Sequence, residues 1–446
     1  FAGPVKENYQ QDPIYTKEFL LKFLTLNPKE VQLMKKSHSS MVKSLPKKFP
    51  DVLSSNFQPN GYVYVGGSHF NYLVLLSLKS LRASGSVFPV EVLIPKMVEF
   101  DVELCNYIFP LYNAKCLVIE DFITKETSKK INKYQMKSIA LLINSFKNVM
   151  LLDSDNMILK NPDYLFLNEP FKSKGFISWP DLWRRATSPF FYKISGVSIN
   201  DYKKIRNSYW HILKKQFHDI KPDWLYSYHD FEGTIQETSS ESGQLLINRE
   251  THAKTIFLST YYNFYGPDHY YPLLTQNSHG EGDKETYISA AHALGQTYYQ
   301  VEEFARDFHK NHHRVKFGRQ RDIIGIGQYD PMIDYNRSTL MTLEESKRND
   351  VDQFKYSSGH SIWEYKIWNQ SELMFLHCNW PKLYTWDLIN SKGIRSFKNA
   401  KGKRQRLYDG LINELGGKRD FELEIVGYMK WYFCEHKDLQ IRGVFN

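Results

Sequence analysis

Apolar positions after about residue 55 alternate between a strand period and a helix period, which predicts a β-α-β succession. Residues 62–65 have strand character, residues 70–82 carry helical spacing, and residues 90–94 form a second apolar strand. The alternation continues through a helix over 102–108, a strand over 116–119, a helix over 131–146 and a strand over 148–152. This last strand is apolar enough to lie centrally in a mostly parallel sheet, so we expect an α/β fold.

Other patterns surround this central succession. Asn27, Pro28 and Glu30 supply an N-cap, a proline at the first helical position and a glutamate at the third, so residues 1–55 are expected to form a helical stem or leader. We assign 56–395 to the catalytic α/β domain and 396–446 to a basic, then helical, C-terminal extension. Further elements are expected as strands over 175–178 and 244–247, helices over 250–258 and 284–293, and an aromatic-rich loop over 261–271.

Composition narrows the class of protein. The 446 residues carry a net charge of +9, and no apolar run approaches the ~20 residues that span a bilayer. The first residues do not resemble a signal peptide, so we expect a truncated chain whose membrane anchor has been removed. Four cysteines without CxxC spacing argue against zinc and allow two disulfides in an oxidising compartment, in agreement with sequons at Asn336 and Asn369.

The basic runs 309–321 and 398–406 lack any nucleic-acid-binding motif, so no nucleic-acid partner is expected.

The sharpest chemical signal is a pair of carboxylates, Asp153 and Asp155, directly after the apolar strand. Ligands of open α/β sheets bind in the crevice at the carboxyl ends of the strands, where both side chains can point. Hard oxygen ligands suit Mg²⁺ or Mn²⁺ bound together with a diphosphate. The alternative interpretation is a solvated turn, which Asp and Asn also favour.

The neighbouring motifs make a resemblance specific. Lys137, a strand, Asp153-Ser154-Asp155 and the segment 161–166 follow one another as in the nucleotide-sugar site of GT-A glycosyltransferases, whose fold is Rossmann-like. Residues 241–247 resemble the Ser-Gly strand of those enzymes, 282–286 their acidic helix start, and 377–382 their late His…Lys element. With 61–67, the aromatic segment 261–271 and 328–331, residues 55–390 most resemble the fungal α-1,2-mannosyltransferases of glycosyltransferase family 71.

The resemblance implies an activity and a setting. Members transfer mannose from GDP-mannose to oligomannosides of cell-wall mannan, with Mn²⁺ or another divalent cation. They act in the Golgi lumen as single-pass type II proteins, so the membrane would be reached only through an N-terminal anchor absent from this chain. Whether this chain starts side branches or extends them stays open.

The resemblance also assigns site residues. Asp155 is favoured as a direct metal ligand, Asp153 is shared between the ion and the ribose, and His377 is the third ligand. Those expected to hold the donor are Tyr64, Gly66, Gly67, Lys137, Asp153 and Lys382. A buried hydrogen-bonded histidine and solvated lysines are the alternatives for His377 and for the two lysines.

Chemistry at the sugar is less determined. An α-linked donor and an α-1,2 product mean retention, through a carboxylate nucleophile or through attack from the face of the departing diphosphate. Glu241 and Asp283 are the candidate catalytic residues, although related retaining enzymes usually carry an amide in place of Glu241. Trp179, Trp183 and Tyr265 are candidates to stack on acceptor sugars, with core packing as the alternative.

Two other functions use similar residues. Haloacid dehalogenase phosphohydrolases also carry Asp-x-Asp after an apolar strand, but normally on the first strand, whereas here the motif follows four predicted strands. A non-catalytic sugar-binding protein would not need the intact carboxylates, histidine and lysines. The sequence therefore favours a glycosyltransferase.

Overall fold

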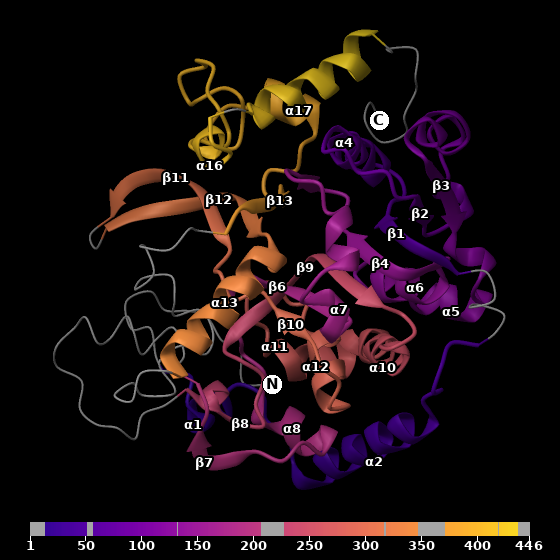
Figure 1. The fold of residues 1–446 in the computed structure, drawn as a ribbon, viewed down its shortest axis with the longest axis vertical. Coiled ribbons are helices and arrows are strands. Elements are labelled where there is room, and N and C mark those ends of the chain that lie inside the picture. Colours follow the sequence, from indigo (N-terminus) through magenta and orange to yellow (C-terminus); the bar gives the residue numbers. More distant parts are fainter. Residues whose placement is uncertain are drawn as a thin grey trace.

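A computed structural model describes residues 14–50, 57–131, 133–206, 227–315, 318–346, 371–417 and 419–435. Its centre is a mixed seven-stranded sheet in which β4, β1, β2 and β3 are successive parallel neighbours, while β9 runs antiparallel to β4 and β6. The α/β class and the mostly parallel sheet are thus confirmed (Figure 1). The strands, in sheet order, are β10 (Tyr299–Gln300), β6 (Phe176–Arg184), β9 (Thr238–Asn248), β4 (Phe146–Leu152), β1 (Gln58–Val65), β2 (Val90–Ile94) and β3 (Ala114–Val118).

A second sheet lies across the end of the first and brings distant segments together. It contains β11 (Arg306–Val315), β12 (Gly318–Tyr329), β13 (Leu373–His377) and β5 (Asn156–Ile158), in that order. Strand β5 starts immediately after the Asp-x-Asp turn, and β13 ends at His377, which is the register partner of Asn156. The pairing continues as the Cys378 amide donates to the Asp155 carbonyl at 2.8 Å. A small third sheet pairs β7 (Asn200–Lys204) with β8 (Phe231–Glu232).

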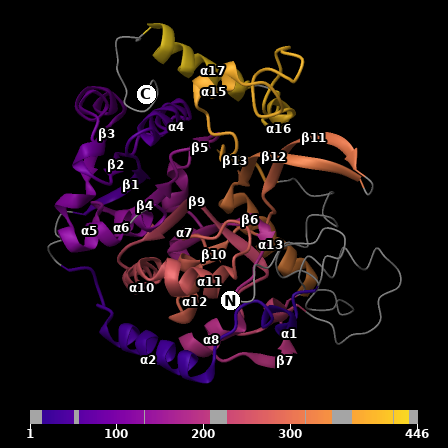
Figure 2. The ribbon, with the colours of Figure 1, turned by 180° about the vertical axis from the view of Figure 1, so that it is seen from behind.

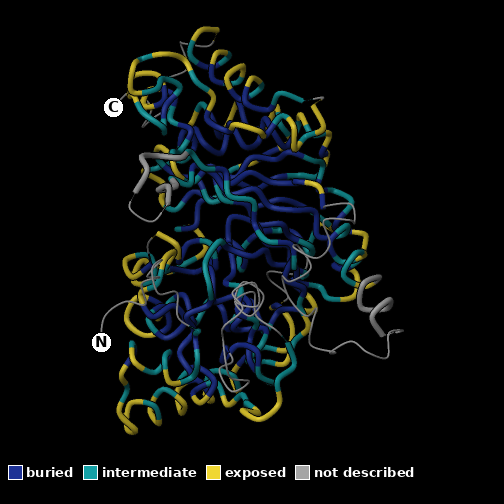
Figure 3. The backbone as a smooth tube through the Cα atoms, turned by 90° about the vertical axis from the view of Figure 1, so that its left-hand side faces the viewer, coloured by how far each residue is buried: buried dark blue, intermediate teal, exposed yellow. Residues whose placement is uncertain are grey.

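Helices cover both faces of the central sheet, as Figures 1 and 2 show from opposite sides. Period-2 alternation in β1 sends Tyr62 and Tyr64 into one apolar cluster and Val63 into the other. The buried segments run through the middle of the molecule and the exposed ones lie at its periphery (Figure 3). The α-helices are α1 (Lys17–Leu20), α2 (Pro28–Ser44), α4 (Phe70–Ala83), α5 (Lys125–Lys130), α6 (Gln135–Ile143), α7 (Phe171–Lys174), α8 (Pro189–Ser195), α10 (Ala253–Phe264), α11 (Tyr271–Thr275), α12 (Thr286–Ala293), α13 (Pro331–Ser346), α15 (Thr385–Asn390), α16 (Leu411–Glu414) and α17 (Phe421–Lys430).

The N-terminal helices pack on the core of the α/β domain. The expected capping box at Asn27 and Glu30 is formed, which confirms the start of α2 at Pro28. His38 of α2 shares a 2.7 Å hydrogen bond with the hydroxyl of Tyr262 on α10, and Leu20 is buried in the same apolar cluster. The boundaries near residues 55 and 395 stay predictions.

One predicted strand is present but longer than expected, and one predicted loop is wrong. The strand expected over 175–178 continues to Arg184, because register shifts flank Pro180 and let the ladder pass a residue that cannot donate. The expected aromatic loop over 261–271 is helical, formed by the end of α10, the π-helical turn η7 (Gly266–Tyr270) and the start of α11. Its tyrosines extend a buried helical face: Tyr262 and Tyr270 stack at 4.5 Å inside the core.

One of the two allowed disulfides is formed, between Cys105 and Cys116, while Cys378 is a buried thiol and Cys434 an exposed one. Among the described residues, no helix combines the length and the apolar character required to cross a bilayer. Asn336 is exposed on α13, and Asn369 lies outside the described residues.

Candidate active site

A cavity of about 480 Å³ opens at the carboxyl end of β4, which we call the front cavity. Most of the residues singled out from the sequence line it, although they come from the whole length of the chain. These are Lys137, Asp153, Asp155, Trp183, Glu241, Asp283, His377 and Lys382. The position matches the crevice in which open α/β sheets bind ligands.

Asp153, Asp155 and His377 form a compact group. One ligand atom from each lies within 4.8 Å of the other two. The His377 Nε2 atom is 3.2 Å from Asp155 Oδ1 and 3.9 Å from Asp153 Oδ2. Two carboxylates and one imidazole are the donor types that Mn²⁺ accepts, and the spacing suits three ligands around one ion. The group therefore fits a divalent cation.

Two lysines stand next to these carboxylates. The Lys137 ammonium lies 2.7 Å from Asp153 Oδ1 and also donates to the Ser242 hydroxyl at 3.1 Å. Lys382 forms an ion pair with Asp155 and keeps about a third of its side chain exposed. Both cations border the cavity, so a bound diphosphate would meet positive charge on two sides.

Burial and charge shift the protonation of the cluster in opposite directions. Burial raises the pKa of Asp153 to about 6, although Lys137 and His377 oppose that rise. Burial also disfavours the charged form of Asp155, yet His377 and Lys382 outweigh it and hold the pKa of Asp155 well below its usual range. The pKa of His377 is raised well above its ordinary value, because Glu241 and Asp155 outweigh the opposing effect of burial.

Glu241 contacts His377 from the side away from Asp155. Its Oε1 atom is 3.2 Å from His377 Nδ1, while its Oε2 accepts the Gly243 amide at 2.8 Å and the Gln244 side chain at 3.3 Å. Gly243 permits this approach, since a Cβ there would lie 2.6 Å from Glu241 Oε2 and 2.7 Å from His377 Nδ1. A carboxylate behind a metal-binding histidine fixes the ring orientation.

Asp283 lines the same cavity, in the segment just before α12. Its Oδ2 accepts a hydrogen bond of 3.1 Å from the Tyr287 hydroxyl and lies 3.6 Å from the Lys137 ammonium. The residue is only 3% exposed. Lys137 thus lies between the carboxylates of Asp153 and Asp283.

The sequence analysis did not single out most of the other residues that line the front cavity. Trp183 stacks on His279 with ring centroids 4.1 Å apart, and Lys284 donates to Asp181 at 2.5 Å. Of the lining residues not singled out, Ser242, Gly282, Lys284 and Asn379 lie within the motifs that carry the resemblance, and Asp181 lies between Trp179 and Trp183 in the sequence. The lining residues not singled out are Tyr134, Asp181, Ser242, His279, Gly280, Glu281, Gly282, Lys284, Ile326 and Asn379.

Several predicted contacts lie elsewhere. Trp179 is 0% exposed, packs edge-on against Phe375 and donates to the Tyr329 carbonyl, so the structure corrects its acceptor role to core packing. The Tyr64 side chain is also in the core, with its hydroxyl on Ser77, which leaves only its backbone for a donor contact. Tyr265 is 43% exposed at the end of α10 and is not among the described residues that line the front cavity.

Gly66 and Gly67 form the turn between β1 and α4. Gly67 has a φ of +103°, and its amide donates to the Asn71 side chain at 2.7 Å. A Cβ at Gly66 would lie 2.7 Å from the same Asn71 oxygen. Glycine is therefore required here by the turn itself, whichever ligand it meets.

Known relatives cover most of the chain. It is 41% identical over 463 residues to the alpha-1,2-mannosyltransferase MNN24 of Candida albicans, a match that covers 100% of this chain and 64% of that protein. It is 36% identical over 441 residues to the alpha-1,2-mannosyltransferase MNN2 of Saccharomyces cerevisiae, which covers 94% of this chain and 71% of that protein. The chain thus spans just under two thirds of the length of MNN24.

Solved structures show more remote likeness. The glycosyltransferase GlyE of Streptococcus pneumoniae TIGR4 is similar over 55% of this chain and 45% of its own, with a TM-score of 0.33 and 13% identity. The galactosyltransferase LgtC, in complex with donor and acceptor sugar analogs, is similar over 54% of this chain and 73% of its own, with a TM-score of 0.32 and 12% identity.

The family model Mannosyl_trans3, described as mannosyltransferase, matches residues 59–330, which include Asp153, Asp155, Glu241 and Asp283. The matched range runs from β1 to the end of β12 and so contains most of the front cavity. Together with the similarity to MNN24 over the whole of this chain, this match shows that the chain belongs to the Mannosyl_trans3 family of mannosyltransferases.

Proposed function

We propose that this protein is a metal-dependent, retaining α-1,2-mannosyltransferase that moves mannose from GDP-mannose to an oligomannoside acceptor. The observation that carries the proposal is the group Asp153, Asp155 and His377, which fits one divalent cation at the carboxyl end of β4. The relatives MNN24 and MNN2 are α-1,2-mannosyltransferases, which favours mannose transfer in α-1,2 linkage over phosphate hydrolysis or sugar binding without catalysis.

Asp153, Asp155 and His377 would hold the cation, with Mn²⁺ the ion that we favour. When bound, the cation offsets the negative charge that develops on the departing diphosphate. Lys137 and Lys382 border the same cavity and would contact the phosphate oxygens as point charges. Water has limited access, because Asp155 and His377 are both less than 10% exposed.

Glu241 acts, in this proposal, as a positioning residue for His377. Both of its oxygens are engaged, one near the imidazole and the other by the Gly243 amide and Gln244. An engaged, buried carboxylate is a poor nucleophile toward a sugar carbon. These contacts favour attack by the acceptor hydroxyl from the face of the leaving diphosphate.

Asp283 and the opposite wall would align the sugars. The Asp283 carboxylate can accept a hydrogen bond from a mannose hydroxyl while Tyr287 and Lys137 hold it in place. The Trp183 and His279 pair offers an aromatic surface for an acceptor ring. We further propose that the full-length protein works in the Golgi lumen as a type II membrane protein.

Product analysis tests this proposal. The chain is incubated with GDP-mannose, Mn²⁺ and a set of short α-mannosides, and the products are examined by NMR. An α-1,2-linked mannose in the product supports donor, linkage and retention together. A β-linked product contradicts retention, transfer only from another nucleotide sugar contradicts the donor, and release of phosphate from a generic phosphomonoester without transfer favours the phosphohydrolase.

A further inference from the structure

Three neighbouring strands end beside one another at the front of the sheet. Asp153 follows β4, the turn of Gly66, Gly67 and Ser68 follows β1, and the 3₁₀ turn η1 (Met97–Glu99) lies beyond the end of β2. Strands β4, β1 and β2 are adjacent and parallel, so the ends of β4 and β2 are about 10 Å apart. A nucleotide whose diphosphate lies near Asp153 and whose ribose lies along the β1 turn would reach Glu99 with its base.

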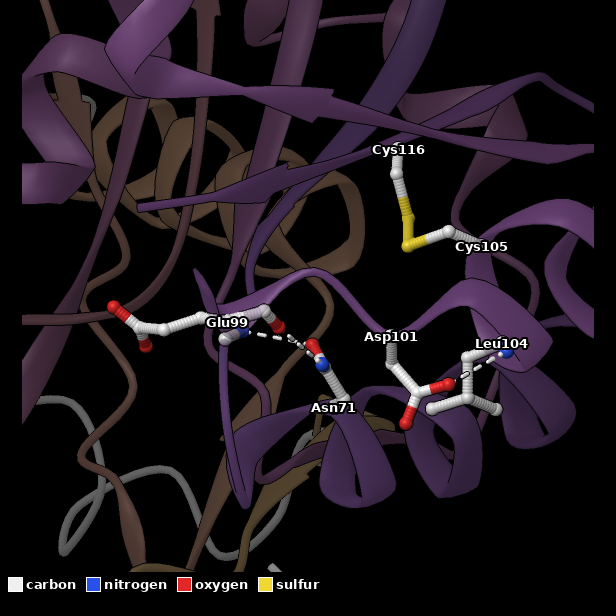
Figure 4. Close-up of a disulfide and its surroundings, with 7 residues drawn as sticks. Asn71, Glu99, Asp101, Leu104, Cys105 and Cys116 are labelled. Atoms are coloured by element: carbon white, nitrogen blue, oxygen red, sulfur yellow. Dashed lines mark hydrogen bonds between the residues drawn. A yellow bond between two sulfur atoms is a disulfide. The ribbon is translucent and has the colours of Figure 1, made fainter. Parts of the chain in front are cut away.

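The Glu99 carboxylate faces this turn. Its Oε2 accepts a 3.1 Å hydrogen bond from the Ser68 hydroxyl, and its main-chain carbonyl accepts one of 3.3 Å from the Asn71 side chain. It lies against the bare α-carbon of Gly67, where a Cβ would be 2.6 Å from Oε2. No hydrogen bond or ion pair to Glu99 Oε1 is found within the described part of the chain, and Figure 4 shows the carboxylate extended away from Asn71.

The segment that carries Glu99 is fixed at both ends. On one side, Asn71 ties it to the β1 turn, since its side-chain amide donates to the Glu99 carbonyl at 3.3 Å and accepts the Gly67 amide at 2.7 Å. On the other, Asp101 accepts the Leu104 amide at 3.0 Å, and the next residue, Cys105, is joined to Cys116 on β3 by the disulfide (Figure 4). A carboxylate held in this way is pre-organised for a ligand.

Two aromatic side chains and a lysine lie between Glu99 and the proposed metal group. His69 follows Ser68 and stands with its ring 4.2 Å from that of Phe70. The Lys382 ammonium, paired with Asp155, lies 5.8 Å from the centre of the Phe70 ring. The β1 turn is thus flanked by the phosphate-binding side of the front cavity and by Glu99.

We propose that Glu99 reads the base of the donor nucleotide and selects guanine; this inference rests on the proposed function. Guanine presents two adjacent donors, the ring N1–H and the exocyclic N2 amino group, which two carboxylate oxygens can accept together. Hypoxanthine lacks the amino group, and adenine presents a ring acceptor at N1 that a carboxylate repels. Glu99 is thus a specificity-determining residue at the far end of the donor site.

The test compares GDP, IDP and ADP by calorimetric titration of the full chain in Mn²⁺, for the parent and for Glu99→Gln. The parent is expected to bind GDP at least about tenfold more tightly than IDP. Glu99→Gln should weaken GDP binding by about 10- to 100-fold and bring the GDP-to-IDP ratio close to one, because a neutral amide cannot accept both donors. Glu103→Gln, on the same segment, serves as the matched control and should keep the parent ratio.

The outcomes separate this inference from the proposed function. If the parent binds ADP as tightly as GDP, the proposed donor is wrong and the role of Glu99 falls with it. If the parent prefers GDP and Glu99→Gln keeps the parental GDP-to-IDP ratio, Glu99 does not read the base while the proposed function stands. Should Glu99→Gln fail to fold, Ser68→Ala removes the hydrogen bond to Oε2 instead and must lower the ratio; an unchanged ratio overturns the inference.

Discussion

Two cavities of similar size lie at opposite ends of β4. The front cavity, about 480 Å³, follows Leu152, whereas a rear cavity of about 450 Å³ is lined by Asn148 near the start of that strand. The rear cavity is otherwise lined by Phe166, Phe171, Lys172, Ser173, Lys174, Gly175, Asn248, Thr251, His252, Gln296 and Thr297. None of its described lining residues is acidic, whereas the front cavity contains carboxylates from β6, from β9 and from two loops.

The difference lies in how the polar groups are satisfied. In the rear cavity Asn248 donates to Asn148 at 2.8 Å, and His252 shares hydrogen bonds with Thr251 and with the Thr297 carbonyl. In the front cavity the charged side chains are buried next to one another. Burial raises the pKa of Asp153, whereas His377 and Lys382 lower that of Asp155. Volume alone therefore says little about function; buried charge held at the carboxyl end of the sheet marks the site.

The largest expected effect separates the two cavities directly. Asp155→Ala removes a proposed metal ligand, and we expect kcat/KM for mannose transfer to fall by about a thousandfold at saturating Mn²⁺. The matched change in the rear cavity, Lys174→Ala, should leave transfer unchanged. Equal rates for Asp155→Ala and the parent would remove the basis for a metal site.

Glu241→Gln tests whether this residue positions His377 or attacks the sugar. Loss of the carboxylate behind the histidine should weaken Mn²⁺ binding by about 10- to 100-fold, with activity restored by excess metal. Metal affinity is measured by titration calorimetry, and rates are followed across a Mn²⁺ series. An inactive variant with parental Mn²⁺ affinity would instead favour a direct role at the anomeric carbon.

Trp183→Ala probes the aromatic pair of the front cavity, Trp183 and His279. Loss of the surface stacked on His279 should raise the acceptor KM by about three- to tenfold while the affinity for GDP stays constant. Trp386→Ala is the control, because that ring is 64% exposed and is not among the lining residues. A change in GDP affinity alone would place Trp183 in the donor site.

The smallest effect concerns the rear cavity. Burial lowers the pKa of His252, with the Thr297 carbonyl opposing, so the folded protein favours the neutral ring. This contribution to stability is complete above the unfolded pKa of about 6.5 and is lost as the pH falls below it. His252→Gln should therefore reduce the loss of Tm between about pH 7 and pH 5 by about 1–2 °C. If His252→Gln loses as much Tm over this pH range as the parent, protonation of His252 does not cause the loss.

Local pattern accounts for much of the fold. Residues 90–94 and 70–82 were predicted almost to their ends, since apolar periodicity and burial coincide there. The pattern failed at Pro180 and at the tyrosines after Tyr261, where a register shift and core packing decide the structure. Aromatic side chains posed the same problem: nothing local distinguishes Trp179 in the core from Trp183 in the cavity.

The sequence by itself determined that an apolar strand ends in Asp153 and Asp155, because strand period and polarity are encoded in consecutive residues. Only the tertiary structure decided which remote groups meet them. The pairing of β13 with β5 brings His377 beside Asp155, and the packing of β9 against β4 puts Glu241 behind the imidazole. Such contacts depend on register and side-chain packing between segments far apart in the chain, which no local period records.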